Sequence, residues 1–178
     1  GESEKGGICL GLVQSEAENK LKARQLDKAF LLYKTLLANN PRFILTKPLD
    51  EARQILVEQN YEYAFCLYEL ILKLQESCKR PVSFWVKPLI DLVYISSILR
   101  RDKDYFNKGR YYLRKLVSCL AELRSSEKGY YKISRLKSME TFSLFCDALD
   151  DVSFCDLYTT LYGDSLFNYR ELGALKLK

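Results

Sequence analysis

Residues 17–41 read AENKLKARQLDKAFLLYKTLLANNP and predict the end of one helix, a tight turn and a complete second helix. The second helix places a small residue, Ala29, one turn before Tyr33, and it stops at Pro41. A small side chain lets two helix backbones approach closely, an aromatic ring fills the space beyond it, and proline ends the helix. Because one helix pair cannot bury its inner faces alone, the stretch predicts further pairs that stack on it.

The same pattern recurs along the chain. A second copy begins 35 positions later and contains Ala52, Leu56, Tyr61, Ala64, Tyr68 and Ile71. A third copy is weaker and contains Ser97, Phe106, Gly109, Leu113 and Leu116, and a fourth lies around Ser143 and Cys155. This pattern resembles the tetratricopeptide repeat, a helical hairpin of about 34 residues. The positions in the first copy that carry the resemblance are Ala17, Leu21, Leu26, Ala29, Tyr33, Leu36 and Pro41.

The resemblance implies an all-α fold of stacked antiparallel helical hairpins with about eight or nine helices. The later copies lie further apart than the first two, so we expect an irregular α-solenoid and not a regular superhelix. We expect a flexible leader or an artificial boundary at residues 1–7, followed by a single helical-repeat domain at 8–178. Within this domain the hairpins are expected at 8–41, 48–79, 84–125 and 129–162, with a capping segment at 164–178.

Individual helix boundaries follow from prolines, glycines and capping residues. They predict helices at 8–24, 26–39, from 48 onward, at 61–78, from 88 or just before it, at 105–125, 130–149 and 152–162. Asp150 and Asp151 precede the last of these and are expected to cap it.

Composition is typical of a soluble globular chain, with 48% hydrophobic and 29% charged residues in 178. No apolar run reaches the ~18 residues that a membrane span needs. The six cysteines are scattered without a CxxC spacing, which favours reduced thiols in an intracellular protein, nuclear or cytoplasmic. Disulfides or a metal site are the alternatives, although zinc would need thiolates or carboxylates alone because the chain has no histidine.

Catalytic signatures are missing from the sequence. The absence of histidine removes the commonest general base, and no phosphate-cradling GxxxxGK[ST] motif occurs. We therefore expect no enzyme activity, no cofactor and no small-molecule substrate.

Charge is distributed unevenly, because residues 100–137 hold 12 basic and four acidic side chains. This region predicts a basic face on two successive helices, formed by Lys108, Arg110, Tyr111, Arg114, Lys115, Lys132 and Arg135. One interpretation is a solvated face partly neutralised by Asp147, Asp150, Asp151 and Asp156. The other is a docking face for an acidic or phosphorylated segment of a protein, or for nucleic acid, with Tyr111 and Tyr112 stacking on bases. Adjacent tyrosines such as these cannot both point inward.

The resemblance also permits a check on one known binding mode, in which the first helices clamp the C-terminal carboxylate of a chaperone. The matching positions hold Gln14, Glu18 and Asp50, and acidic side chains would repel a carboxylate. The leading hypothesis is therefore a non-enzymatic scaffold or adaptor domain that binds a partner protein in a larger assembly, through its helical groove or its basic face. A nucleic-acid-binding helical module and a structural oligomerisation domain are the alternatives.

Overall fold

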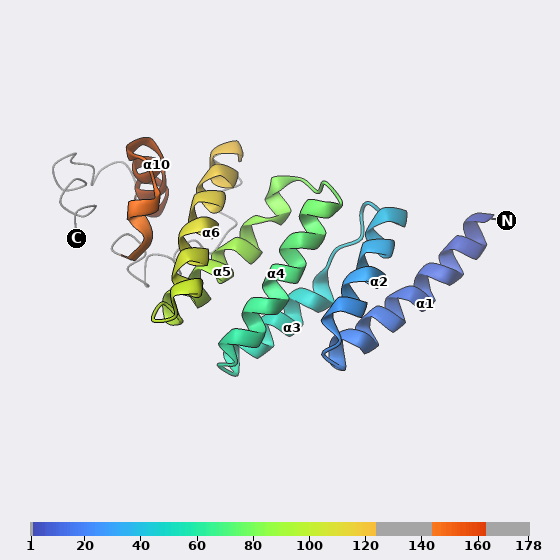
Figure 1. Ribbon diagram of the computed structural model, residues 1–178. Helices are drawn as coiled ribbons and strands as arrows, with labels where there is room; N and C mark the ends of the chain where they lie inside the picture. The colour runs from blue at the N-terminus through green and yellow to red at the C-terminus, as the bar shows by residue number, and fades with distance from the viewer. Residues whose placement is uncertain (1, 124–143, 163–178) are drawn as a thin grey trace. The chain divides into compact units, whose positions relative to one another are not determined.

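The structure is a computed structural model that describes residues 2–123 and 144–162, and it contains only helices and their connections in this part of the chain (Figure 1). Its seven α-helices are α1 (Glu2–Lys22), α2 (Leu26–Asn39), α3 (Thr46–Val57), α4 (Tyr61–Ser77), α5 (Val86–Ile98), α6 (Lys103–Glu122) and α10 (Asp151–Tyr162). Two short 3-10 helices accompany them, η1 (Val82–Phe84) and η2 (Cys146–Ala148). The predicted all-α class is confirmed for these residues. None of the described helices has the length and apolar character that crossing a membrane requires.

The chain divides into two compact units, residues 1–80 and 81–178, where the sequence predicted a single domain at 8–178. The boundary follows Lys79 and Arg80, at the proline that the sequence had indicated only as the end of a helix. Helix α1 already begins at Glu2, so it includes residues that we expected in a flexible leader. Two glycines weaken a helix without forbidding it.

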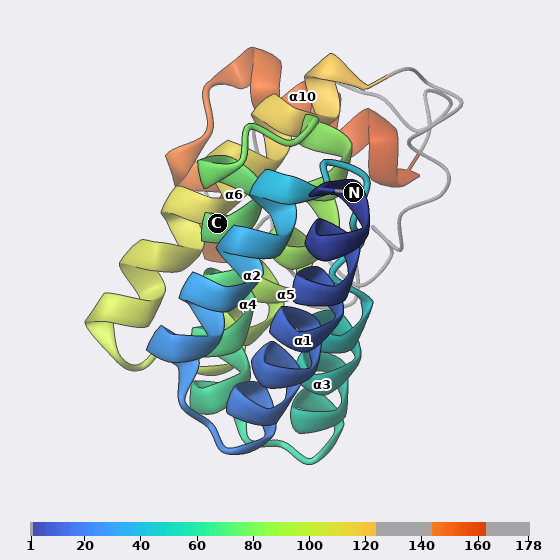
Figure 2. The same ribbon diagram turned by 90° about the vertical axis from the view of Figure 1, so that its right-hand side faces the viewer.

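Unit 1 consists of two antiparallel helix pairs, α1 with α2 and α3 with α4 (Figure 1). Seen from the side, α1 and α3 form one layer and α2 and α4 form the other (Figure 2). The two alanines at which the sequence predicted close helix contacts, Ala29 and Ala64, are both 0% exposed. Tyr33 and Tyr68 lie one turn beyond them and are also buried. The small-then-aromatic pattern therefore marks the core of both helix pairs.

Three turns in unit 1 share one backbone geometry. Arg24, Gln59 and Lys79 have left-handed φ angles of 59°, 64° and 51°. In each turn, the N–H of the next residue donates to a carbonyl five residues back, which closes the helix end as a Schellman motif. The bonds are Gln25 N to Lys20 O at 2.9 Å, Asn60 N to Ile55 O at 3.2 Å and Arg80 N to Gln75 O at 2.9 Å. Glycine usually occupies this position, so its absence concealed the motif in the sequence.

A buried arginine ties the end of unit 1 to the loop between its helix pairs. The Nη2 atom of Arg80 donates a hydrogen bond to the backbone carbonyl of Phe43. Phe43 lies in the segment that connects α2 and α3. The loop is therefore held by a side chain from the far end of α4.

Unit 2 is built on the antiparallel pair α5 and α6, which meet at Gly109. A Cβ atom added at Gly109 would lie 2.8 Å from the Cβ of Ser96 on α5 and 2.6 Å from the Cζ of Phe145. The sequence placed Gly109 in the third copy of the repeated pattern, which also contains Ser97. The neighbour of Gly109 on α5 is Ser96, and the hydroxyl of Ser97 donates to the carbonyl of Tyr94 at 2.7 Å.

The last described helix, α10, begins at Asp151, one residue before the predicted start, and of the two predicted capping residues Asp150 forms the cap. Oδ1 of Asp150 accepts a hydrogen bond from the backbone N–H of Ser153 at 2.7 Å, which is an N-cap. The predicted helix at 130–149 is wrong at its end, because residues 146–148 form a 3-10 helix. The rest of that helix and the capping segment at 164–178 lie mainly outside the described residues.

Candidate functional site

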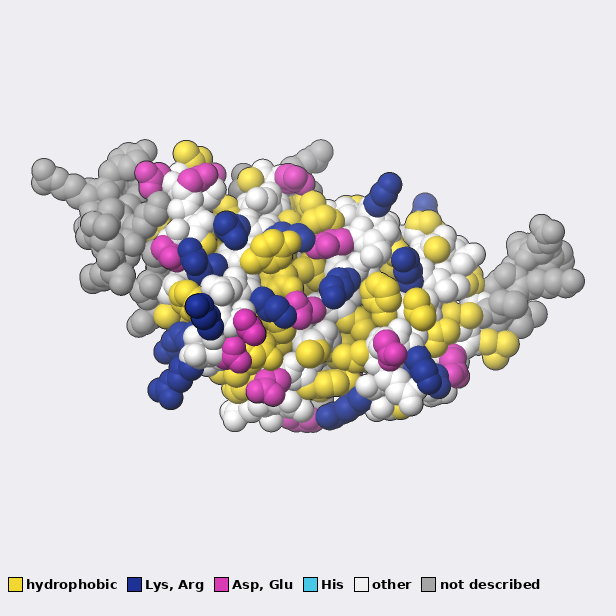
Figure 3. All heavy atoms as spheres, in the orientation of Figure 1, with side chains coloured by type: hydrophobic (Ala, Val, Ile, Leu, Met, Phe, Trp, Pro, Cys, Tyr) yellow, Lys and Arg dark blue, Asp and Glu magenta, His cyan; other side chains and the backbone are white. Residues whose placement is uncertain are grey.

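Helix α6 carries the described part of the predicted basic face. Its buried stripe, which includes Gly109, Leu113, Leu116 and Leu120, packs inward and turns the opposite side of the helix to solvent. Lys108, Tyr111 and Arg114 are exposed, and Arg110 and Lys115 are half-buried. Basic side chains gather over α6, with acidic side chains among them (Figure 3). Lys132 and Arg135 lie outside the described residues.

Four residues of α6 line a small hollow that is open to solvent and has a volume of about 290 Å³. They are Tyr111, Arg114, Lys115 and Ser118, which we call the α6 cup. Their spacing of three, four and seven residues places them on one side of the helix. The cup thus combines two cationic side chains with an aromatic ring and a hydroxyl.

Lys115 is held between two aromatic rings. Its Nζ atom lies 5.6 Å from the ring centroid of Tyr111 and 5.6 Å from that of Trp85, which follows η1. Both distances are within the range of cation–π attraction. These contacts place the ammonium group near both rings at the edge of the cup.

Arg110 belongs to a different environment from the cup, although the sequence grouped it with Arg114. Its Nη2 atom lies 3.1 Å from Oδ2 of Asp147, and its guanidinium carbon lies 6.0 Å from the ring centroid of Phe106. The predicted neutralisation by Asp147 is therefore present at Arg110. No carboxylate of the described residues forms an ion pair with Arg114.

One of the two adjacent tyrosines is exposed and the other is buried, so they do not both point inward, as the sequence predicted. Tyr111 is 49% exposed and Tyr112 is 7% exposed, and their rings meet edge to face with centroids 5.3 Å apart. Only Tyr111 is accessible to a binding partner. The hypothesis that both rings stack on bases is thus wrong for Tyr112.

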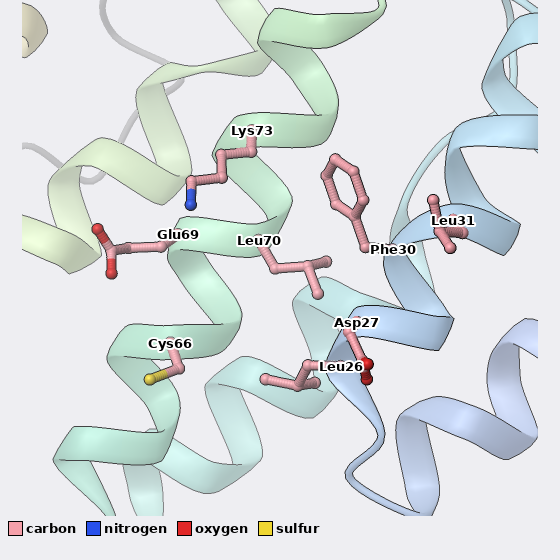
Figure 4. A pocket seen from close by; sticks show the side chains of 8 residues that line it. All are labelled: Leu26, Asp27, Phe30, Leu31, Cys66, Glu69, Leu70 and Lys73. Atoms are coloured by element: carbon pink, nitrogen blue, oxygen red, sulfur yellow. The ribbon is translucent and has the colours of Figure 1, made fainter.

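A second hollow lies in unit 1, between α2 and α4, and its lining residues were not predicted from the sequence. It has a volume of about 560 Å³ and is lined by Leu26, Asp27, Phe30, Leu31, Cys66, Glu69, Leu70 and Lys73. We call it the α2–α4 groove. Leu26, Phe30 and Leu70 lie between the two helices, and the ends of Glu69 and Lys73 point away from α2 (Figure 4).

The α2–α4 groove is apolar at its centre and charged at its rim. Leu31 is 64% exposed and lines the groove beside Phe30. Asp27, Glu69 and Lys73 supply both signs of charge around it. An apolar strip bordered by mixed charges is the surface that an amphipathic helix complements.

The three positions that the resemblance compares with a chaperone-tail clamp are Gln14, Glu18 and Asp50. Nε2 of Gln14 donates a hydrogen bond to Oε1 of Glu18 at 3.2 Å, and both residues are on α1. Asp50 is exposed on α3. Neither helix offers a cation at these positions.

The described residues contain no group of three or more cysteine, aspartate or glutamate side chains that would hold a metal ion. Among the described residues, no disulfide involves Cys66, Cys78, Cys119 or Cys155, and Cys66 is exposed in the α2–α4 groove.

Comparisons of the chain with protein-family models, with curated proteins and with solved structures give no match. The evidence for function is therefore the chemistry of the two surfaces described above.

Proposed function

We propose that this chain is a non-enzymatic interaction domain, a scaffold or adaptor within a larger intracellular assembly, nuclear or cytoplasmic. Its fold is proposed to be an irregular, tetratricopeptide-like stack of helical hairpins. The burial of Ala29 and Ala64 at equivalent positions of two helix pairs supports this proposal. The recurrence of the same left-handed turn at Arg24 and Gln59, 35 residues apart, supports it as well.

The observation that carries the proposed function is the α2–α4 groove. Its occupant is an amphipathic helix of a partner protein, with apolar side chains at a spacing of three or four residues. Phe30, Leu31 and Leu70 would contact those side chains, and Asp27 and Lys73 would pair with charges at the edges of the partner helix. Burial of apolar surface supplies the binding energy, and the rim charges select the orientation.

A matched pair of leucines tests this proposal. Leu31 in the groove is 64% exposed, and Leu12 on α1, outside the groove, is 68% exposed. Wild type, Leu31→Glu and Leu12→Glu are used as baits, and the bound proteins are quantified by mass spectrometry. The partner is then purified, and its affinity is measured by calorimetry.

We expect a stoichiometric partner that binds wild type and Leu12→Glu but not Leu31→Glu. A peptide from that partner should gain helical circular dichroism when it binds. Equal binding to all three baits, or binding by an extended peptide, would contradict the proposed groove.

The alternative function is nucleic-acid binding by the basic region at 100–137. The observation that favours it is the exposed ring of Tyr111 beside Arg114 and Lys115. Binding of a labelled single-stranded RNA should then weaken steeply with salt and disappear when Arg110 and Arg114 are both changed to glutamate. The absence of RNA binding at low salt would eliminate this alternative.

A further inference from the structure

We infer that the α6 cup binds the phosphate group of a phosphorylated side chain on a partner protein. This inference rests on the proposal that the chain binds a protein, and it names a second site with different chemistry from the α2–α4 groove.

The cup offers cationic donors that are already placed. Arg114 is exposed and has no carboxylate partner among the described residues, so its guanidinium is available to an anion. Lys115 lies beside it with its ammonium held by the rings of Trp85 and Tyr111. Arginine binds phosphate oxygens through two parallel N–H bonds, and a neighbouring lysine adds a point charge.

The floor of the cup leaves space for a compact group. Ser118 contributes a small side chain whose hydroxyl donates to the carbonyl of Arg114 at 3.2 Å. The exposed ring of Tyr111 forms a wall on the other side. A volume of about 290 Å³ accommodates a single phosphorylated side chain.

The charges around the cup favour one phosphate over a nucleic-acid strand. Asp104 lies two turns before Tyr111 and Glu122 one turn after Ser118, and both are exposed on the same side of α6. Arg110 is already paired with Asp147 at 3.1 Å. A polyanion laid along the helix would therefore meet carboxylates on both sides of the cup, whereas one phosphate in the cup would meet the cations Arg114 and Lys115 that line it.

The protein contains its own reporter for this site. Trp85 is the only tryptophan of the chain, and the ammonium of Lys115 lies 5.6 Å from its ring. A phosphate that draws Lys115 away from the ring should change the fluorescence of Trp85. The full chain is titrated with a degenerate peptide library that carries a fixed phosphoserine, with the same library carrying serine, and with single-stranded polyuridine.

Arg114→Glu is the test variant. Arg101→Glu is the control, because Arg101 is an exposed arginine of the same unit that does not line the cup. We expect the phosphoserine library to bind wild type and Arg101→Glu, and to bind Arg114→Glu roughly tenfold or more weakly, as the loss of a charge-assisted hydrogen bond implies. The serine library should not bind. Circular dichroism checks that the exposed substitutions leave the helices intact.

Three results would overturn the inference. They are equal binding of the serine and phosphoserine libraries, equal weakening by Arg114→Glu and Arg101→Glu, and binding of polyuridine without binding of phosphoserine peptides. The groove variant Leu31→Glu separates this inference from the proposed function, because it should keep phosphoserine binding while losing the helical partner. Loss of phosphoserine binding in Arg114→Glu with the helical partner retained identifies the cup as a separate site.

Discussion

The absence of a side chain at Gly109 allows α5 and α6 to pack closely in unit 2. A Cβ atom there would lie 2.8 Å from the Cβ of Ser96 and 2.6 Å from the ring of Phe145, which is fully buried. Neither neighbour has space to retreat, because Ser96 is also fully buried on α5. The distance between α5 and α6 is therefore set by the absence of a side chain.

We expect Gly109→Ala to lower the free energy of unfolding by about 1–3 kcal/mol, the usual range for overpacking. The control is Gly11→Ala on α1, where a new Cβ would meet no atom within 4 Å. Since alanine favours helix over glycine, Gly11→Ala should raise the stability by up to ~1 kcal/mol. Urea unfolding followed by circular dichroism measures both. Equal stability of the two variants would show that the contact at Gly109 is looser than the structure describes.

Gln59 illustrates the opposite situation, since here glycine would fit better than the native residue. Its φ of 64° is unfavourable for any residue with a Cβ atom, and its side chain is exposed. We expect Gln59→Gly to raise the free energy of unfolding by about 1 kcal/mol. Glu58→Gly, at a neighbour with φ of −72°, should lower it instead. If both variants are destabilised in thermal melts, the left-handed strain at Gln59 is negligible.

At the scale of the helix, caps and stops determined what could be predicted. The predicted bounds of 26–39 match those of α2, because Pro41 stops this helix and Leu26 starts its apolar stripe. The start of α10 was predicted from Asp150 for the same reason. The start of α5 at Val86 was less clear, since η1 and Trp85 precede it without a side-chain cap.

The α2–α4 groove was not predicted, because its residues come from two helices about 40 positions apart. One signal was present in the sequence: Leu31 is a large apolar residue outside the buried stripe of Ala29, Tyr33 and Leu36. A second signal was the number of apolar residues in α4, which includes Phe65 and Leu70 as well as the repeat positions Ala64, Tyr68 and Ile71. These residues form one surface only because α2 packs against α4, and that packing could not be predicted from either helix alone.

The cap of α10 supports a prediction at this scale. We expect Asp150→Ala to destabilise the protein by ~1 kcal/mol, because it removes the acceptor for the N–H of Ser153. Asp150→Asn keeps a side-chain oxygen and should retain most of the stability. Thermal melts of the two variants measure the difference. Equal destabilisation would mean that the charge of Asp150, and not its cap hydrogen bond, stabilises the helix.

At the scale of the whole molecule, a buried hydroxyl links folding to alkaline pH. Burial, with a smaller contribution from Glu18, raises the pKa of Tyr33 above its ordinary value of 10.0. Burial also raises the pKa of Tyr63, and Arg24 opposes this increase. A group that holds its proton more tightly when folded keeps its full stabilisation below the unfolded pKa and loses it as the pH rises. The free energy of unfolding should therefore fall above pH 10.0.

Tyr33→Phe tests this linkage. It removes the ionisable hydroxyl and keeps the ring, so the fall in stability above pH 10.0 should become shallower by up to about 1.4 kcal/mol per pH unit. The control is Tyr111→Phe, whose ring is exposed on α6. Denaturant unfolding of both variants and wild type at a series of alkaline pH values gives the slopes. Identical slopes for all three would rule out Tyr33 as the source.

The hydrogen-bonded turns at Arg24 and Lys79 have a consequence for limited proteolysis. Trypsin cuts after arginine and lysine and needs several residues of extended backbone in its cleft, and both side chains are exposed. The left-handed φ angles at Arg24 and Lys79 prevent an extended backbone at these positions. The backbone hydrogen bonds from Gln25 and Arg80 to the preceding helices hold the turns in this conformation. Native protein should therefore resist cleavage after Arg24 and Lys79, and fragments ending there should appear only once unit 1 has unfolded.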